Sequence, residues 1–520
     1  MFEQMFIKGD IMFSTIKSVG MLGMDSFMVT IEADVTMGKS RFDIVGLPDV
    51  AVNESKDRVR SAIKNIGFSY PEIRKTINLA PADVRKEGPI YDLPILIALL
   101  IASKQLDKIP ADCAFLGEIS LGGDVKQING VLPMVIEARN NGIKSIFIPE
   151  DNKAEASVVD GITIYPVKNV LQVIKHINNE ELISPVKFNI PDIDFSSASF
   201  ADFADVKGQF EAKRALEVAA AGSHNVLLIG SPGAGKSMLA KRIPSILPEM
   251  TLAESLDTTK IYSVSGKLTK GQALIRQRPF RSPHHTISAA GLSGGGTIPK
   301  PGEISLAHNG VLFLDELPEF SRQSMEAMRQ PIEDGVVTIS RVAGTLSYPC
   351  NVMLICAMNP CPCGFYGHPS KKCSCPNGAP ARYLSKVSGP LLDRLDIHIE
   401  VPPVNFDELS DTSKAESSEL IRQRVNTARR IQIKRFEGTD VTCNAGMTAE
   451  MTRKYCILTE KASVMLRSSF DRLGLSARAY DKILRVARTI ADLDGAELID
   501  VKHIAEAIQY RSLDRKFWNN

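Results

Sequence analysis

The first 180 residues alternate between helical and strand-like patterns of apolar positions. Apolar residues recur at helical spacing between residues 51 and 66, and a glycine follows as a stop. This stripe consists of Val52, Val59, Ile63 and Ile66. It predicts an amphipathic helix, whereas residues 75–80 and 145–149 have the pattern of strands. Residues 1–180 are therefore expected to form a separate α/β domain.

Polarity rises between residues 178 and 202, where prolines and serines replace the apolar pattern. This composition predicts a linker over 181–203. An α/β core is expected over 204–402, with a cysteine-rich insertion at 360–390. From 403 to 520 the pattern is helical, with one apolar face made by Ile483, Val486, Ile490 and Leu493. The last part is therefore predicted to be a helical lid.

The overall composition excludes some classes of protein without selecting a function. The chain has 520 residues and a formal net charge of only +2, so no global charge indicates a nucleic-acid partner. The longest apolar run, residues 93–103, is shorter than the roughly 20 residues of a membrane-spanning helix and predicts a buried one. Charged residues interrupt the first 13 residues, which argues against a secretory signal. We expect a cytoplasmic protein without membrane association.

A phosphate-binding loop is predicted near the centre of the chain. A short apolar strand over 225–229 precedes a glycine-rich segment, and helical spacing resumes at Met238. The loop residues are Gly230, Ser231, Pro232, Gly233, Ala234, Gly235, Lys236 and Ser237. Backbone N–H groups of such a loop surround phosphate oxygens, the lysine reaches the outer phosphates, and the hydroxyl binds Mg²⁺. ATP and Mg²⁺ are therefore the predicted cofactors.

Two further apolar strands end in polar residues suited to ATP hydrolysis. Residues 311–314 precede Asp315 and Glu316, where the first carboxylate would support Mg²⁺ and the second would activate water. Residues 352–357 lead to Asn359, whose amide can orient that water. The order of strand, loop and polar residue predicts a P-loop ATPase core.

Two arginines are candidates for stabilising the charge that develops during hydrolysis. Arg394 follows a Gly-Pro turn and would lie at a subunit edge, from which it would enter the site of a neighbour. Arg478 opens a predicted lid helix and would touch the γ-phosphate. An arginine supplied in this way accelerates hydrolysis by about 10³ to 10⁵. Assembly into a ring is therefore expected to be required for activity.

These motifs, in this order, resemble the magnesium-chelatase-like AAA+ ATPases of the YifB/ComM type. The matching segments are GSPGAGKS, RPFRSPHHTIS, GEISLAHNGVLFLDELPEF, AMNPCPCG, SGPLLDRLDIHIEV and LSARAYDKILRVARTIADL. The resemblance implies a bacterial hexameric ring and a DNA helicase that promotes branch migration during homologous recombination, notably in natural transformation. DNA and recombination proteins are the partners it implies. Position by position, it assigns nucleotide contacts to Lys236 and Ser237, hydrolysis to Asp315 and Glu316, the first sensor to Asn359, the finger to Arg394 and the second sensor to Arg478.

The N-terminal region resembles the proteolytic domain of Lon-type proteases, which has a fold like ribosomal protein S5 domain 2. In that family a serine nucleophile and a lysine base occupy two neighbouring segments. Residues 86–94 match the serine segment without a serine, and 117–132 match the lysine segment with Leu132 in place of the lysine. Because a hydrolase needs both groups within hydrogen-bond reach, peptidase chemistry is not expected. We expect a docking or ring-lining role.

Four of the nine cysteines crowd into the predicted insertion, as the pairs Cys361 with Cys363 and Cys373 with Cys375. Their thiolates are candidate ligands of a structural zinc, which would order a loop with little core of its own. The alternative is a set of buried reduced cysteines, because the spacing is Cys-x-Cys and not the commoner Cys-x-x-Cys. The same loop is a second candidate DNA surface, since it lacks carboxylates and carries Lys371, Lys372, Arg382 and Lys386.

Two other segments are candidate DNA contacts. Residues 336–341 and 345–350 predict a hairpin whose tip, near Arg341, could project into the pore of a ring. Residues 266–300 contain no acid, which suits binding to the DNA backbone but also the neighbourhood of nucleotide phosphates. Their basic residues are Lys267, Lys270, Arg276, Arg278, Arg281 and Lys300. The adjacent His284 and His285 are expected to make structural hydrogen bonds and not a metal site.

Three functions remain open at this point. The first is a hexameric, ATP-driven motor on single-stranded or branched DNA. The second is a protein-remodelling ATPase, like the motor subunit of magnesium chelatase, that acts on a polypeptide through its N-terminal domain. Chelatase function itself is disfavoured, because the cysteine-rich insertion is much longer than the same region of chelatase subunits. The third is an ATP-dependent protease, which the missing serine and lysine disfavour.

Overall fold

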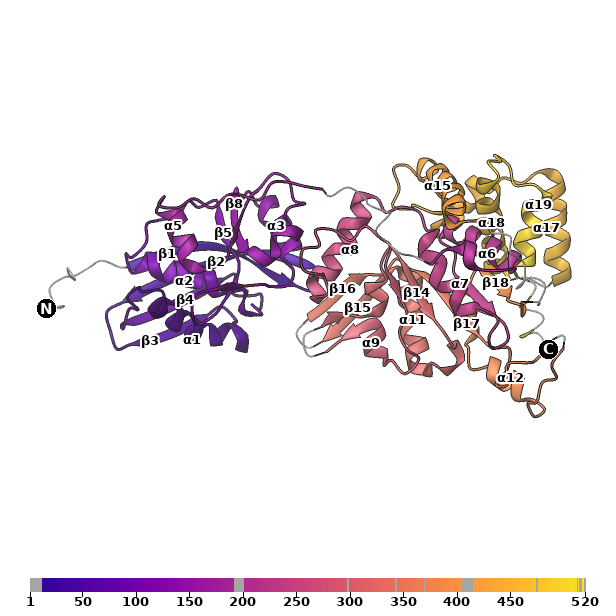
Figure 1. Cartoon of the computed structure of the whole chain (residues 1–520), viewed down its shortest axis with the longest axis horizontal. Coiled ribbons are helices and arrows are strands. Elements are labelled where there is room, and N and C mark those ends of the chain that lie inside the picture. The colour runs from indigo at the N-terminus through magenta and orange to yellow at the C-terminus, as the bar shows by residue number, and fades with distance from the viewer. Residues whose placement is uncertain are drawn as a thin grey trace. The chain divides into compact units, whose positions relative to one another are not determined.

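The computed structural model of the chain divides into two compact units (Figure 1). One contains Met1–Ile193 and Ser255–Ile275, and the other contains Asp194–Glu254 and Arg276–Asn520. Each unit has its own hydrophobic core, as expected for a chain of this length. The residues that the structure describes are 12–190, 201–296, 299–341, 344–368, 370–404, 415–473, 476–511, 513 and 517–518.

A seven-stranded mixed sheet forms the centre of the first unit, in the order β3-β4-β2-β1-β5-β8-β9. Its strands are β1 (Met12–Leu22), β2 (Asp25–Thr36), β3 (Arg41–Val45), β4 (Arg74–Ala80), β5 (Cys113–Phe115), β8 (Ser145–Pro149) and β9 (Thr163–Val167). The hairpin β1–β2 and its neighbour β4 pair antiparallel, whereas the outer strands join in parallel. Two short strands, β6 (Glu118–Ile119) and β7 (Val125–Lys126), pair separately. The strands predicted over 75–80 and 145–149 are confirmed as β4 and β8.

The helices of this unit follow the apolar pattern. They are α1 (Val50–Asn65), α2 (Asp92–Ala102), α3 (Val131–Asn140), α4 (Lys153–Ala156) and α5 (Val170–Ile177). Helix α1 begins where the Asp49 carboxylate accepts a hydrogen bond from the Val52 N–H at 2.7 Å, and its predicted apolar stripe is largely buried. The apolar run that is too short to span a membrane is α2, which is buried along its whole length. The α/β fold expected for the N-terminal region is thereby confirmed.

Most of helix α8 (Leu252–Ser265) belongs to the segment Ser255–Ile275, which is part of the first unit. The Ser263 hydroxyl donates to the buried Glu155 carboxylate at 2.6 Å, and the Gly130 N–H donates to the Ser263 carbonyl at 3.1 Å. Gly266 has φ +68°, and a side chain there would meet the Asn129 amide at 2.9 Å. These contacts fix the end of α8 against the segment that resembles the lysine region of Lon-type proteases.

A five-stranded parallel sheet forms the centre of the second unit, in the order β11-β14-β17-β10-β18. Its strands are β10 (Val226–Ile229), β11 (Phe280–Arg281), β14 (Val311–Leu314), β17 (Met353–Met358) and β18 (Ile397–Glu400). The three central strands are apolar throughout and fully buried, as is typical of a parallel sheet covered on both faces. Ligands of such sheets bind at the carboxyl ends of the strands.

Helices and small hairpins surround this sheet. The helices are α6 (Phe210–Gly222), α7 (Lys236–Arg242), α9 (Ala289–Ser293), α10 (Glu303–Leu306), α11 (Arg322–Asp334), α12 (Ala379–Leu384) and α13 (Gly389–Leu392). The hairpins pair β12 (Gly294–Gly295) with β13 (Lys300–Pro301), and β15 (Val336–Arg341) with β16 (Gly344–Pro349). The second is the hairpin predicted from the sequence. Its tip and the Arg341 side chain lie outside the described residues.

The described elements beyond β18 are all helical, which confirms the predicted lid. They include α15 (Ser418–Arg435), α16 (Ala449–Tyr455), α17 (Glu460–Leu473), α18 (Ala477–Leu493) and α19 (Val501–Gln509). The predicted stripe on α18 is buried at Ile483, Val486 and Ile490. Among the described helices, none combines the length and the apolar character that crossing a bilayer requires.

A buried ionic network holds α18 in place. The Asp492 carboxylate accepts hydrogen bonds from Arg435 at 2.5 and 2.7 Å and from Arg488 at 3.0 Å. Arg488 is only 1% exposed and Asp492 only 2%, and the Asn444 amide donates to the same carboxylate at 2.8 Å. Removal of one member of such a network leaves the others buried without compensation.

We predict that Asp492→Ala lowers the free energy of unfolding by about 3 to 5 kcal/mol, because it leaves two arginines of the lid without their carboxylate. Urea unfolding monitored by circular dichroism measures this change. The matched control is Asp471→Ala on the exposed side of α17, which is expected to stay within about 0.5 kcal/mol of the wild type. Equal unfolding midpoints for the two variants would contradict the role given to Asp492.

Candidate active site

The phosphate-binding loop connects β10 to α7. The strand ends at Ile229, and α7 begins at Lys236 behind Gly235, which has φ +92°. A side chain at Gly230 would meet the Val401 carbonyl oxygen at 2.4 Å, so only glycine fits this approach of two backbone segments. The predicted sequence of strand, glycine-rich loop and helix is therefore confirmed. Its backbone N–H groups lie at the start of a helix, where anions bind.

Lys236 lies at the base of this loop. Its ammonium donates to the carbonyls of Gly230 at 2.7 Å and Ser231 at 3.0 Å, and to the Asn359 side-chain oxygen at 3.1 Å. Burial lowers the pKa of Lys236, while the carboxylates of Asp315 and Glu316 oppose that shift. The structure thus brings Asn359, the predicted first sensor, into direct contact with Lys236, the predicted phosphate-binding lysine.

The Ser237 hydroxyl and the Asp315 carboxylate form the second contact of the site. The hydroxyl donates to the carboxylate at 2.5 Å, across from the end of β14. A hydroxyl and a carboxylate are oxygen ligands of the kind that Mg²⁺ prefers. The donor set therefore fits Mg²⁺, which would neutralise phosphate charge when it is bound with ATP.

Glu316 projects next to this pair in an unusual backbone conformation. Its φ is +53°, which is uncommon for a residue with a side chain and is found preferentially at functional sites. The side chain is 57% exposed, and its carboxylate lies 3.4 Å from Nδ1 of His285. The residue is thus available for a water-activating role. The sequence analysis expected His285 to have a structural role but did not identify Glu316, 31 positions later in the chain, as its neighbour.

Arg394 and Arg478 lie together in a different cavity. Arg394 is paired with the Glu333 carboxylate and donates to the carbonyls of Pro390 at 2.6 Å and Arg329 at 3.2 Å. The Arg478 side chain is 72% exposed and lies 4.0 Å from Asp393. Both arginines line the same cavity. The described residues that line this cavity include none of the predicted nucleotide-site residues, which are Lys236, Ser237, Asp315, Glu316 and Asn359.

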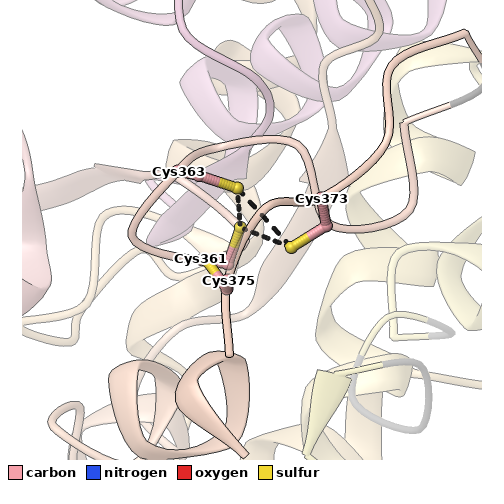
Figure 2. A group of neighbouring side chains, drawn as sticks. All are labelled: Cys361, Cys363, Cys373 and Cys375. Carbon is pink, nitrogen blue, oxygen red and sulfur yellow. Dashed lines mark hydrogen bonds between the residues drawn. The ribbon is translucent and has the colours of Figure 1, made fainter. Parts of the chain in front are cut away.

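The cysteine cluster forms directly after Asn359. Figure 2 shows the four thiols of Cys361, Cys363, Cys373 and Cys375 facing one another. All four sulfur atoms lie within 4.8 Å of one another, and three of the separations are 3.3, 3.5 and 3.7 Å. Tetrahedral zinc with Zn–S bonds of about 2.3 Å requires sulfur atoms about 3.8 Å apart. The arrangement of donors therefore fits zinc.

The electrostatic environment of the cluster favours one thiolate. Burial raises the pKa of the Cys363 thiol, but hydrogen bonds from the backbone of Phe365 and Ser374 and from neighbouring thiols outweigh it and lower the pKa to about 5. Burial raises the pKa of Cys361 to about 12. Since the thiolate is the form that binds metal, the lowered pKa of Cys363 suits this residue to be a metal ligand.

The cysteine loop packs against the phosphate-binding loop. Gly364 has φ +80°, and a side chain there would lie 2.3 Å from the Pro232 ring. Cys361, three residues before Gly364, is fully buried. The cysteine loop and the phosphate-binding loop are therefore in direct contact at Gly364 and Pro232.

The candidate DNA contacts differ in how freely their charges are presented. Within residues 266–300, Lys270 pairs with Asp151 at 2.9 Å, Arg278 with Glu254 at 3.0 Å and Arg281 with Glu303 at 2.6 Å. Asp151, Glu254 and Glu303 all lie outside residues 266–300, so the composition of that segment alone does not reveal these ion pairs. In the cysteine loop, Lys371, Lys372 and Arg382 are exposed.

In the segments that resemble Lon-type proteases, Leu132 stands at the position of the family's lysine. Leu132 is fully buried, and its N–H donates to the Glu155 carboxylate at 3.3 Å. Burial raises the pKa of Glu155, which also accepts hydrogen bonds from Ser263 and Asn152. The position of the family's lysine is thus enclosed by apolar core and by α8.

Comparison with known proteins agrees with this geometry. Residues 202–409 match the family described as magnesium chelatase, subunit ChlI, and residues 415–511 match the C-terminal part of that subunit. Residues 31–152 match a further family described as subunit ChlI of magnesium chelatase. The N-terminal region is 28% identical over 160 residues to the Lon protease of Buchnera aphidicola, which covers 28% of this chain and 20% of that protein.

Two relatives match nearly the full length. The chain is 43% identical over 499 residues to the competence protein ComM of Haemophilus influenzae, with 95% of this chain and 96% of that protein covered. It is also 43% identical over 496 residues to YifB of Escherichia coli, with the same coverage. The chain therefore belongs to the ComM/YifB family of magnesium-chelatase-like AAA+ ATPases.

Proposed function

We propose that the chain is a cytoplasmic, ATP-driven DNA motor that acts as a hexameric ring and promotes branch migration in homologous recombination and natural transformation. One observation carries the ring: Arg394 and Arg478 share a cavity that the residues of the nucleotide site do not line. An arginine that serves hydrolysis from such a position reaches the nucleotide of a neighbouring subunit. Because Arg394 and Arg478 both line this separate cavity, the observation supports a role for both arginines at the nucleotide site of a neighbouring subunit.

Each residue of the nucleotide site then has a distinct role. Lys236 binds the outer phosphates, Ser237 and Asp315 hold Mg²⁺, and Glu316 accepts the proton of the attacking water. Asn359, which is hydrogen-bonded to Lys236 at 3.1 Å, orients that water. The neighbour's arginine neutralises the charge that develops on the γ-phosphate.

The choice of DNA as the track is supported by two facts. The relative from Haemophilus influenzae is named a competence protein, and competence is the uptake of DNA. In the cysteine loop, Lys371 and Lys372 are exposed and the Tyr366 ring is partly exposed. Lysines of this kind bind the phosphates of single-stranded DNA, and an aromatic ring stacks on its bases. Single-stranded or branched DNA and recombination proteins would be the partners of the ring.

A protein-remodelling ATPase without a DNA track is the second candidate. The family descriptions favour it, since they name the motor subunit of magnesium chelatase. The pairing of Lys270, Arg278 and Arg281 with carboxylates favours it too, because those cations are less available to phosphates. In this case the first unit would bind the polypeptide partner.

Steady-state ATP hydrolysis separates the two candidates. We expect single strands and a four-way junction to stimulate hydrolysis several-fold, with an effect that fades as salt rises from about 50 to 200 mM because counterions compete for the phosphates. Glu316→Gln is the blank. Hydrolysis that DNA leaves unchanged at every salt concentration would refute the DNA motor and support protein remodelling.

We also propose that the cluster of Cys361, Cys363, Cys373 and Cys375 binds one structural zinc ion. Elemental analysis of the purified protein is expected to find about one zinc per chain, and the double variant Cys361→Ser with Cys363→Ser is expected to lose it. That variant should weaken DNA binding more than ATP binding, since the exposed lysines lie in the loop. The control Cys113→Ser changes a cysteine of the first unit and should keep the metal. A wild-type protein free of zinc would refute this assignment.

A further inference from the structure

We propose that Arg382 of α12 contacts the terminal phosphate of ATP bound at the phosphate loop of its own subunit. Arg382 lines a cavity of about 550 Å³ together with Glu316 and Asn359. The remaining lining residues are Glu319, Pro362, Ala379, Tyr383 and Lys386. The water-activating carboxylate and the first sensor therefore share one space with a guanidinium group. The inference rests on the proposed ATPase function and adds a phosphate-binding residue to that site.

Helix α12 is fixed close to the sensor strand. Burial and the carboxylates of Glu319 and Glu316 raise the pKa of Tyr383 to about 12, and a hydrogen bond from the Asn359 backbone opposes this rise. The same ring is 7% exposed, and Lys386 lies 5.6 Å from its centre. The chain thus leaves the sheet at Asn359, forms the cysteine cluster, and returns to Asn359 through Tyr383. This closed path determines where Arg382 lies.

Arg382 has no carboxylate partner among the residues that the structure describes. Lys386, the other cation of the cavity, lies 3.5 Å from Glu319, and Glu316 lies 3.4 Å from His285. Of the two cations that line the cavity, the Arg382 guanidinium is therefore the one available to bind an anion. Its planar fork can donate two parallel hydrogen bonds to a phosphate group.

The position of Arg478 explains why such a residue is needed. The resemblance to the family assigns the γ-phosphate contact of the lid to Arg478, but this side chain lies beside Asp393 in the cavity of Arg394. Among the described residues of the two cavities, Arg382 is the arginine that shares a space with Glu316 and Asn359. In its own subunit it complements Lys236, while Arg394 and Arg478 serve a neighbour.

The test compares the affinities of ATP and ADP in the Glu316→Gln background, where hydrolysis is blocked, with fluorescent analogues of the two nucleotides and without DNA. We expect Arg382→Ala to weaken ATP binding by about 10- to 100-fold, as for a lost charge-assisted hydrogen bond, with little change for ADP. Arg382→Lys should recover part of the loss, because it keeps the charge but not the fork. The control is Arg430→Ala on the exposed face of α15, which should change neither affinity.

Equal weakening of ATP and ADP by Arg382→Ala would overturn the proposal, because it would indicate a structural role for the residue. Unchanged binding of both nucleotides would overturn it as well. Failure of the Glu316→Gln protein itself to bind ATP would refute the proposed ATPase function together with this inference. Since no DNA is present, the result does not depend on the track that the motor uses.

Discussion

The parallel register of β10, β14 and β17 is the constraint on which the nucleotide site depends. Ile229 pairs with Met358, and Leu314 pairs with Cys356, so the three strands end at one edge of the sheet. The residues that follow these strands therefore meet there, and a slip of one residue would turn each of them to the opposite face. The hydrogen bonds from Lys236 to Asn359 and from Ser237 to Asp315 then connect the loop to the ends of β17 and β14.

The cysteine loop extends from the same edge of the sheet. It begins after Asn359, contacts the phosphate loop at Pro232, and ends in α12, whose Tyr383 packs back near Asn359. The four thiols, which lie within 4.8 Å of one another, close this path. Binding of a metal, the shape of the phosphate loop and the position of Arg382 are thereby linked in our account.

The parts of the fold that local pattern determines could be predicted from the sequence. Strand, loop and helix around Lys236, the apolar stripe of α1 and the buried run of α2 follow from spacing alone. Contacts between distant segments could not be predicted. Arg278 pairs with Glu254, the end of α8 packs in the first unit, and His285 meets Glu316, because tertiary packing and not local composition decides these partners. Roles assigned from resemblance to Glu316, Arg394 and Arg478 stay predictions.

If hydrolysis needs residues from two subunits, as we propose, mixtures of two inactive variants provide the test. Arg394→Ala lacks the finger but keeps its own Glu316, whereas Glu316→Gln lacks the carboxylate but keeps its Arg394. Each variant alone is expected to bind ATP without hydrolysing it, and mixtures are expected to recover part of the wild-type rate, because some interfaces combine the two intact residues. A complete lack of hydrolysis at every mixing ratio, with rings assembled, would contradict the claim.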